Sequence, residues 1–580
     1  MTSTPSARGG VWLIEDTAPG SIFTPEQLTG EHRLIARTAD EFVTNEVLPA
    51  IERLEQKDWT LSRRLLRRAG ELGLLGTDVP EAFGGVGLDK VSSLIVGEAV
   101  GRSASFATTF GAQTGLTITP LLCFGTEEQK AKYLPRLVTA DIIGAYALSE
   151  SGSGSDALGA KSRATRLPDG SFSLTGEKMW ITNGGFADVF IVFAKVGGTD
   201  FSAFIVERGF PGVNSGKEER KMGLHGSSTT PLVLQDAKVP ADNVLGEIGK
   251  GHKVAFNVLN YGRFKLAAMC SGGARAIVGE AARYAIERTQ FGRPIGSFGA
   301  IKHKIAEMAV RQFAVESMLF RTAGLIDGAL RETDEKDAVS VILEELAVEA
   351  SILKVAGSEM LDFVVDENIQ IHGGNGFVHD YPAERYYRDA RVNRIFEGTN
   401  EINRLLIPGM LVRRALKGTL PLLPAAKKLQ DDLLTPFASE QPSGMPLEPE
   451  RRAVAAMKKV ALMVLGTAMQ THGEKLTDQQ EMLTCSADII IDVFAAESVL
   501  LRSAAGQDGL RHAAAAIFVS NASARVEAAA RTALAAMARG DALRAQLAAL
   551  RRMLETMPVD TIALRRQIAD RVMERGAYPF

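Results

Sequence analysis

Hydrophobic residues in the first part of the chain recur with the spacing of α-helices. Thr24-Pro25-Glu26-Gln27 combines an N-cap residue, a proline at the first helical position and a capping-box glutamine. Helical spacing continues through Ile35 and Phe42. We therefore predict a helical domain over residues 24–141. Residues 1–23 contain Gly, Pro and Ser without periodicity, which predicts an irregular lead-in.

The pattern then changes to short runs rich in β-branched and aromatic residues. Asp169-Gly170 between two of these runs is typical of a hairpin turn. We predict an antiparallel β-sheet domain over residues 142–249, set between two helical domains. The predicted strands are Ile142 to Leu148, Ser171 to Thr175, Val189 to Val196, Ala203 to Val206 and Leu232 to Val239.

Long Ala-rich helical patterns return over residues 250–416 and predict a four-helix bundle. Six of the 22 prolines lie between Lys417 and Glu450, so residues 417–450 predict a linker or an extended strap. Amphipathic patterns over residues 451–580 predict an extra C-terminal helical domain. The predicted fold class is α+β, mainly α.

The C-terminal extension has two interpretations. The favoured one is a bundle that packs on the rest of the chain or across a dimer. The other is peripheral contact with a membrane surface, and apolar periodicity alone does not separate the two. The basic residues whose spacing can place them on one face are Arg525, Arg531, Arg539 and Arg544.

Composition and charge exclude several classes of protein. The chain has 580 residues, with 66 basic and 69 acidic side chains, so no basic face for nucleic acid is expected. Its three cysteines are widely spaced and its eight histidines lack ligand spacing, so we expect neither disulfides nor a metal site. The sequence from Met1 lacks the pattern of a secretory or transit peptide. A bacterial cytoplasmic location is the simplest expectation.

One carboxylate stands out as a candidate catalytic group. Glu397 lies in Arg394-Ile-Phe-Glu397-Gly-Thr-Asn400, beside a glycine and two small hydrogen-bonding side chains. A carboxylate on an apolar-flanked turn can have its pKa raised by desolvation, which suits a general base. The alternative, on this motif alone, is a helix-capping or solvated glutamate.

Two upstream segments predict a site for a flat, polar-edged ligand. Ala147-Leu-Ser-Glu150-Ser-Gly152-Ser-Gly154-Ser155-Asp156 is a Gly/Ser loop whose N–H groups and hydroxyls can hold a phosphate or a polar cofactor edge. Lys178-Met-Trp180-Ile-Thr182 places an indole and a hydroxyl two residues apart on a predicted strand, so both should point to one side. Either segment alone is weak evidence, because Gly/Ser loops and core tryptophans are common.

Together with Gln370-Ile-His-Gly373-Gly374-Asn-Gly376-Phe and Arg288-Thr-Gln290-Phe291-Gly292, these segments resemble the acyl-CoA dehydrogenase family over roughly residues 30–415. The chain beyond resembles the C-terminal extension of the very-long-chain branch, including its mitochondrial members. The resemblance implies α,β-dehydrogenation of an acyl-CoA thioester with FAD, in fatty-acid β-oxidation, with electrons passed to an electron-transfer flavoprotein. It also implies a homodimer, because each flavin contacts both subunits.

The resemblance carries roles onto individual residues. Glu397 would be the base that removes the α-proton, and its backbone N–H, with a flavin ribityl hydroxyl, would stabilise the thioester oxygen. Ser155, Asn260, Tyr261, Arg263 and Gly398 would bind substrate. The residues expected to bind FAD are Leu148, Ser149, Gly154, Ser155, Trp180, Ile181, Thr182, Arg288, Gln290, Phe291, Gln370, Gly373, Gly374, Thr399 and Asn400.

Departures from the family pattern bear on specificity. One branch places its base just before the arginine that corresponds to Arg263, but here that position is Gly262, so Glu397 is the expected base. Gly299, and the small residues between Gly111 and Thr119, favour a long-chain substrate, although plain helix packing also explains the small residues. Two other functions stay open: a non-catalytic assembly or binding factor with the same fold, and an acyl-CoA oxidase.

Overall fold

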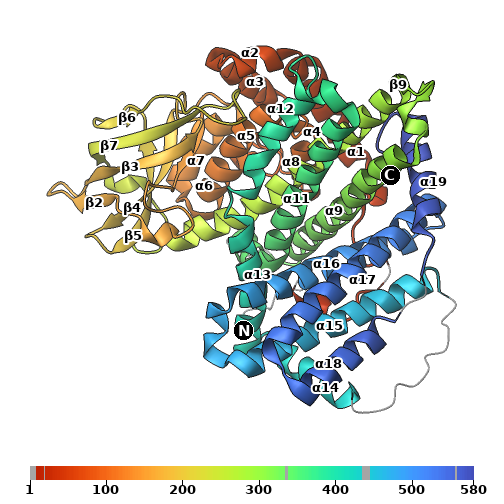
Figure 1. The fold of residues 1–580 in the computed structure, drawn as a ribbon. Coiled ribbons are helices and arrows are strands. Elements are labelled where there is room, and N and C mark those ends of the chain that lie inside the picture. Colours follow the sequence, from red (N-terminus) through yellow and green to blue (C-terminus); the bar gives the residue numbers. More distant parts are fainter. Residues whose placement is uncertain (1–7, 19, 334–337, 434–444, 556–557) are drawn as a thin grey trace.

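The computed structural model describes residues 8–18, 20–333, 338–433, 445–555 and 558–580. The predicted fold class is confirmed: a β-sheet domain separates two helical regions in the sequence, and further helices follow. In Figure 1 the sheet lies to one side of the helical body, and the C-terminal extension lies along another side.

The first α-helix begins later than predicted. The predicted capping box forms, with the Thr24 N–H donating to Gln27 Oε1 at 3.1 Å, but it caps only the 3-10 turn Pro25–Gln27. Leu28 then adopts an extended ψ of 129°, which ends that turn, and Thr29 caps the true helix. The helices of this region are α1 (Gly30–Phe42), α2 (Ile51–Glu55), α3 (Trp59–Glu71), α4 (Lys90–Val100), α5 (Ala104–Gln113), α6 (Thr119–Phe124) and α7 (Glu127–Val138), with π-helical turns η3 (Val43–Val47) and η6 (Thr114–Ile118).

Within the described residues, eight strands form one sheet in the order β6-β7-β3-β2-β4-β5-β8, with β1 beside β4. Asp169-Gly170 forms the predicted turn, which joins β2 to β3, and Gly170 adopts φ +84° there. The sheet is mostly antiparallel, but β1 and β2 pair with β4 in parallel because intervening strands supply the crossover. The strands are β1 (Gly144–Ala147), β2 (Arg163–Arg166), β3 (Phe172–Thr182), β4 (Val189–Val196), β5 (Asp200–Glu207), β6 (Val213–Ser215), β7 (Thr229–Val239) and β8 (Val244–Leu245).

Long helices of the second helical region pack against one another at small residues. A Cβ added to Gly357 would lie 3.1 Å from Ala267 Cα, so the absence of a side chain lets the two helices that carry them approach closely. A short hairpin of β9 (Thr289–Gln290) and β10 (Arg293–Pro294) follows the first helix. The helices are α8 (Gly251–Glu287), α9 (Gly299–Arg331), α10 (Ala338–Glu345), α11 (Ala347–His372), α12 (Ala383–Ala390) and α13 (Asn400–Leu416), with the 3-10 turns η10 (Gly373–Phe377) and η11 (Arg391–Arg394).

The Pro-rich segment is not an extended strap over its first part, which corrects the prediction. It contains α14 (Leu422–Leu433), whose Leu422 and Leu429 are buried. Pro421 and Pro424 fit because they fall before or in the first turn, where no intrahelical N–H bond is lost. Residues 434–444 lie outside the described residues. The later helices are α15 (Glu448–His472), α16 (Gln480–Ala504), α17 (Gly509–Met537), α18 (Gly540–Met553) and α19 (Thr561–Arg575).

Buried charges join the extension to the helical body. Glu316 on α9 accepts hydrogen bonds from Arg275 on α8 (2.7 Å), from Arg502 on α16 (2.8 Å) and from the Tyr578 hydroxyl (3.1 Å). Arg502 also donates to Glu26 at 2.9 Å. Each charge in this cluster has an opposite charge beside it, as buried ions require, although Arg275 Nε has no hydrogen-bond partner among the described residues.

The N-terminal lead-in is more ordered than its composition indicates. Its 3-10 turn Val11–Leu13 buries Trp12, whose indole N–H donates to Glu349 on α11 at 2.8 Å. The Trp12 ring lies 4.6 Å, centroid to centroid, from Phe494 on α16. The lead-in therefore packs between the bundle and the extension.

Candidate active site

Glu397 lies on a tight turn between η11 and α13. Its backbone adopts φ +57°, a left-handed conformation that is unfavourable for a non-glycine residue. Local hydrogen bonds hold the turn: Thr399 Oγ1 caps α13 by accepting from Ile402 N at 3.2 Å, and the Asn403 amide donates to the carbonyls of Gly398 (2.9 Å) and Thr399 (3.0 Å). The turn thus fixes Glu397 in a strained conformation.

The Glu397 carboxylate has an enclosed oxygen atom and makes no ion pair with a described residue. Its Oε2 atom is buried and has no hydrogen-bond partner among the described residues. Burial raises the pKa of Glu397, and the charges of Arg263 and Lys354 offset part of that rise, which leaves it at about 7. The Tyr146 hydroxyl is also buried without a partner, and burial and then the charge of Glu397 raise its pKa. A carboxylate with such a pKa can accept a proton near neutral pH.

Gly262 provides the space for this carboxylate. A Cβ at position 262 would lie 2.5 Å from Glu397 Oε2 and 3.0 Å from its Cδ. Any side chain there would displace the carboxylate. The position that holds the base in one branch of the resembled family is therefore here the cradle for Glu397.

The predicted substrate residues next to Gly262 are engaged with protein groups. Arg263 Nε donates to the Glu397 carbonyl at 3.2 Å, and its Nη1 donates to Asn260 Oδ1 at 2.9 Å. The Tyr261 hydroxyl hydrogen-bonds to Asp78 and, at 3.1 Å, to Ser93. Asn260 and Tyr261 are buried, so in this structure they act on the site through Arg263 and through packing.

A buried ion pair shapes the Gly/Ser loop. Lys178 on β3 donates to Glu150 Oε1 at 2.6 Å and to the Leu148 carbonyl at 3.2 Å. Glu150 also accepts from the N–H groups of Lys161 (2.6 Å) and Ser162 (3.1 Å). Burial would raise the pKa of Glu150, but these hydrogen bonds outweigh it and lower the pKa to about 2. Glu150 is therefore a structural anion that fixes the loop.

Beyond this anchor the loop is open. Gly154 and Ser155 are exposed, and a Cβ built at Gly154 would meet no atom within 4 Å. The Ser149 and Ser155 hydroxyls donate to no described residue. The loop therefore presents free N–H and hydroxyl groups at its surface.

Trp180 and Thr182 lie at the end of β3, but not on a regular strand. A bulge falls between Lys178 and Ile181, and Trp180 adopts φ +59°, so strict alternation of side chains does not apply at Trp180. Burial nevertheless alternates: Trp180 is 57% exposed, Ile181 is 2% exposed and Thr182 is half-buried. The Thr182 hydroxyl bonds to no described residue. An exposed indole beside a free hydroxyl suits a flat ring with a polar edge.

The other predicted cofactor residues lie in a separate place. They gather where α8 and α11 end, and Tyr284 joins the two ends: its hydroxyl donates to the His372 carbonyl (3.1 Å) and accepts from the Asn375 amide (2.9 Å). In Figure 1, β9 lies on the opposite side of the molecule from β3. All are exposed: Arg288, Gln290, Phe291, Gln370, Gly373 and Gly374. One chain therefore does not bring the two groups together.

Asn400 is turned inward rather than toward the space beside Glu397. Its Oδ1 accepts from Lys354 Nζ at 2.6 Å, and its Nδ2 donates to Glu359 Oε1 at 2.9 Å. Thr399 serves as the helix cap. Both residues therefore hold the turn in this structure, and direct contact with a cofactor remains a prediction.

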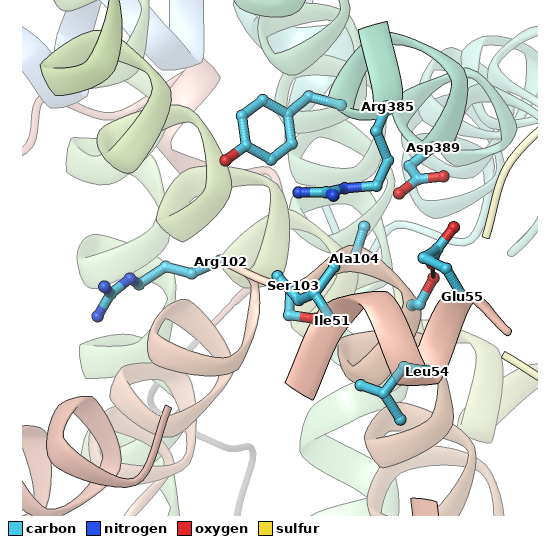
Figure 2. A pocket seen from close by; sticks show the side chains of 10 residues that line it. Ile51, Leu54, Glu55, Arg102, Ser103, Ala104, Arg385 and Asp389 are labelled. Carbon is cyan, nitrogen blue, oxygen red and sulfur yellow. Dashed lines mark hydrogen bonds between the residues drawn. The ribbon is translucent and has the colours of Figure 1, made fainter. Parts of the chain in front are cut away.

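A small pocket elsewhere is a domain junction. Figure 2 shows side chains of α2, of α12 and of residues 102–105 around this pocket, among them Glu55, Ala104 and Asp389, and none is a predicted site residue. Asp389 accepts from Leu224 N at 2.5 Å and Glu55 accepts from Gly226 N at 3.0 Å, so the loop before β7 docks on the helices here. Burial raises the pKa of Asp389 to about 6.

Sequence reasoning gave no role to several residues that build the site. Tyr146 and Lys354 reach Glu397 from β1 and α11, segments far from it in the chain. Glu150 and Lys178 lie in the two segments that predicted the ligand site. Their opposite charges beside a glycine loop could have indicated a buried ion pair. Lys354 offered a weaker signal, as the single lysine in the apolar run Ala350 to Gly357.

Known proteins resemble this chain over most of its length. Family models match four segments: "Acyl-CoA dehydrogenase, N-terminal domain" at residues 29–141, the middle domain at 145–237, and two C-terminal domains at 249–410 and 456–552. A "Probable acyl-CoA dehydrogenase" of Bacillus subtilis (strain 168) is 48% identical over 584 residues, covering 98% of each chain. The mitochondrial very long-chain specific acyl-CoA dehydrogenase of Rattus norvegicus is 38% identical, covering 75% of this chain and 68% of its own. A crystal structure of an acyl-CoA dehydrogenase complexed with FAD from Bacillus anthracis has a TM-score of 0.97 and 47% identity, covering 99% of this chain and 100% of that one.

Proposed function

Because this chain belongs to the acyl-CoA dehydrogenase family, we propose that it catalyses the FAD-dependent α,β-dehydrogenation of long-chain acyl-CoA thioesters. The observation that carries the proposal is the Glu397 carboxylate, enclosed and without a hydrogen-bond partner on Oε2, with its pKa raised by burial to about 7. Such a group suits removal of a carbon-bound proton.

The residues present fit FAD. Trp180 offers an exposed aromatic face at the bulge in β3, and the hydroxyls of Ser149, Ser155 and Thr182 bond to no described residue. The glycines Gly154, Gly373 and Gly374 leave open space where side chains would stand. The flavin ring of FAD would be held by Leu148, Ser149, Ser155, Trp180, Ile181 and Thr182. FAD, when bound, supplies the hydride-accepting chemistry at the substrate β-carbon.

The chain itself supplies the proton chemistry. Glu397 takes the α-proton onto its carboxylate. The Glu397 N–H donates to no acceptor among the described residues, so it is free to bind the thioester oxygen as charge develops there. Arg263, held against the Glu397 carbonyl at 3.2 Å, keeps the turn in place. The enclosed position of Oε2 keeps competing water away from the base.

We also propose a homodimer, which the separation of the two groups of predicted FAD residues supports. In one chain β9 lies on the opposite side from β3 (Figure 1). Phe291 is 93% exposed and adopts φ +51°, and Phe377, at the end of the η10 turn that contains Gly373 and Gly374, is 86% exposed. Large exposed aromatic residues in a strained turn are costly unless a partner covers them. We therefore place the adenosine diphosphate end of a partner's FAD on this surface.

Long-chain specificity rests on small residues opposite α8. The Cβ of a residue at Gly115 would lie 3.8 Å from Lys265 Cδ, and one at Gly111 would lie 3.2 Å from Met269 Cε. Lys265 and Met269 follow Gly262, the cradle of the base, by three and seven positions on α8. The likeness to a very long-chain specific relative supports the same specificity.

We place the enzyme in fatty-acid β-oxidation in the bacterial cytoplasm, with an electron-transfer flavoprotein as acceptor. Peripheral membrane contact has less support, because Arg525 pairs with Asp492 at 2.5 Å, Arg531 with Glu527 at 3.3 Å and Arg544 with Asp541. One helical segment, Glu448–Asp478, is long and apolar enough to cross a membrane, but 67% of its apolar window is buried, as in a core helix.

The test is an anaerobic titration of the FAD-loaded protein with saturated acyl-CoAs from C4 to C20, followed by flavin absorbance. Bleaching by long chains alone is the expected result. A yellow protein that no acyl-CoA bleaches would contradict catalysis and favour an assembly or binding role. Stoichiometric hydrogen peroxide on admission of air, at a rate matching turnover, would favour an oxidase instead.

A further inference from the structure

Lys354 is a buried cation without an anionic contact. Its side chain is 0% exposed in the middle of α11, and its Nζ donates to one neutral acceptor, Asn400 Oδ1, at 2.6 Å. No described carboxylate lies within 4.0 Å of it. By contrast, buried Lys178 pairs directly with Glu150. Burying an ammonium without a paired anion is costly, which calls for a reason.

The charges that face Lys354 belong to the candidate active site. Burial lowers the pKa of Lys354 to about 8, the charges of Glu397 and Glu401 favour its protonated form, and the charge of Arg263 opposes it. The groups that face Glu397 are Arg263, Lys354 and the Tyr146 hydroxyl. Lys354 and Glu397 are therefore close enough to interact electrostatically, yet they make no ion pair. A direct ion pair would lower the basicity of Glu397.

Asn400 links the lysine to the turn and to the C-terminal extension. It is the first residue of α13, three positions after Glu397, and it donates to Glu359 at 2.9 Å. Glu359 accepts two hydrogen bonds from Arg404, at 2.6 and 2.9 Å. Arg404 Nε in turn donates to Asp488 on α16 at 2.8 Å. The turn is thus anchored on α11 and, through Arg404, on the extension.

We propose that Lys354 is a positioning residue for the reaction assigned above: its ammonium sets the proton affinity of Glu397 from a distance, and its hydrogen bond to Asn400 fixes the turn that carries Glu397. The inference rests on the proposed function, and it adds a second buried cation beside Arg263 to the machinery of the base. Loss of the ammonium disfavours the ionised, proton-accepting form of Glu397.

Two substitutions separate charge from anchoring. Lys354→Gln removes the charge and keeps an amide donor for Asn400, whereas Lys354→Met removes both. In stopped-flow reduction of the flavin by a long-chain acyl-CoA, we expect the pH midpoint to rise by about one unit in both variants. The high-pH plateau should fall further in Lys354→Met than in Lys354→Gln. A wild-type midpoint in both variants would overturn the proposal.

Lys458 offers a matched control. It is also a buried lysine, on α15, but it pairs directly with Glu497 and donates to the Glu15 carbonyl at 3.1 Å, away from Glu397. Lys458→Met should lower the melting temperature and leave the pH midpoint of flavin reduction unchanged. A midpoint shift equal to that of Lys354→Met would mean that loosened packing, not the charge of Lys354, moves the base, and would overturn the proposal.

A measurement without substrate keeps this inference separate from the proposed reaction. Thermal unfolding between pH 5 and 9 is compared for the wild type, Glu397→Gln, Lys354→Gln and the double variant. The stabilisation that Glu397→Gln gives above pH 7 should be larger in the Lys354→Gln background, because Glu397 is then harder to ionise. Additive effects would overturn the inference whatever the titration shows. Coupling in a protein that no acyl-CoA reduces would overturn only the proposed reaction.

Discussion

Glu150, which is buried, and Glu397, which is half-buried with an enclosed Oε2 atom, have opposite acidities. Glu150 accepts hydrogen bonds from Lys178, Lys161 and Ser162, which outweigh its burial and lower its pKa to about 2. Glu397 has an enclosed Oε2 with no partner, and burial raises its pKa to about 7. Desolvation raises the pKa of both carboxyls, so the hydrogen-bond partners decide the outcome. A satisfied carboxylate serves as scaffold, and an unsatisfied one can take a proton.

The largest effect is expected from Glu397→Gln, which removes the carboxylate that can take a proton. The amide keeps the shape of the side chain but cannot accept the α-proton, so the rate of flavin reduction should fall by about 10²- to 10⁴-fold. Flavin content and acyl-CoA affinity should stay near wild type, which equilibrium binding of a non-reducing acyl-CoA analogue checks. Reduction within tenfold of wild type would place the base elsewhere.

For Glu150, the corresponding test is Lys178→Met, which should destabilise the protein. Glu150 would keep its burial and lose its ammonium partner, which costs about 3–5 kcal/mol of unfolding free energy. Chemical denaturation measures this loss, and FAD should be retained poorly because the loop moves. The matched control is Lys238→Met, since Lys238 pairs with Asp169 at 2.7 Å on the surface, where the expected cost is below about 1 kcal/mol. Equal losses in the two variants would contradict the scaffold role.

The two carboxyls also predict opposite pH effects on stability. The pKa of Glu397 is raised in the fold from 4.5 to about 7, so its contribution to stability is present below pH 4.5 and is lost as pH rises to about 7. Glu397→Gln should therefore be more stable than wild type above pH 7, by at most about 3 kcal/mol, and not at pH 4.5. The contribution of Glu150 is present above pH 4.5 and is lost as pH falls toward 2. Thermal melts across this range check both directions.

The smallest effect on flavin reduction is expected from a substitution at Gly262. In Gly262→Ala the new Cβ would lie 2.5 Å from Glu397 Oε2, so the carboxylate must shift and flavin reduction should slow by about tenfold. Gly328→Ala in α9 is the control, because a Cβ there meets no atom within 4 Å. If both variants reduce flavin at the wild-type rate, the fit between Gly262 and the carboxylate has no catalytic role.

Short motifs and turns could be predicted from the sequence, whereas the surroundings of Glu397, which depend on distant segments of the chain, could not. Glu397, its glycine and Thr399 form a compact motif, and the Asp169-Gly170 turn and the β-rich runs were readable in the same way. The environment of Glu397 was not readable, because Tyr146, Gly262 and Lys354 reach it from β1, α8 and α11. Tertiary packing likewise produced the bulge at Trp180, where a regular strand was expected.

The lead-in around Trp12 has a consequence for synthesis of the chain on the ribosome. Its partners are Glu349 and Phe494, the second of which follows Trp12 by 482 positions. At ordinary rates of translation Trp12 is synthesised roughly 25 to 95 s before Phe494. During that interval the apolar side chain of Trp12 lacks its contact with Phe494. Trp12 is thus made early but gains its full set of contacts only after the extension has been translated.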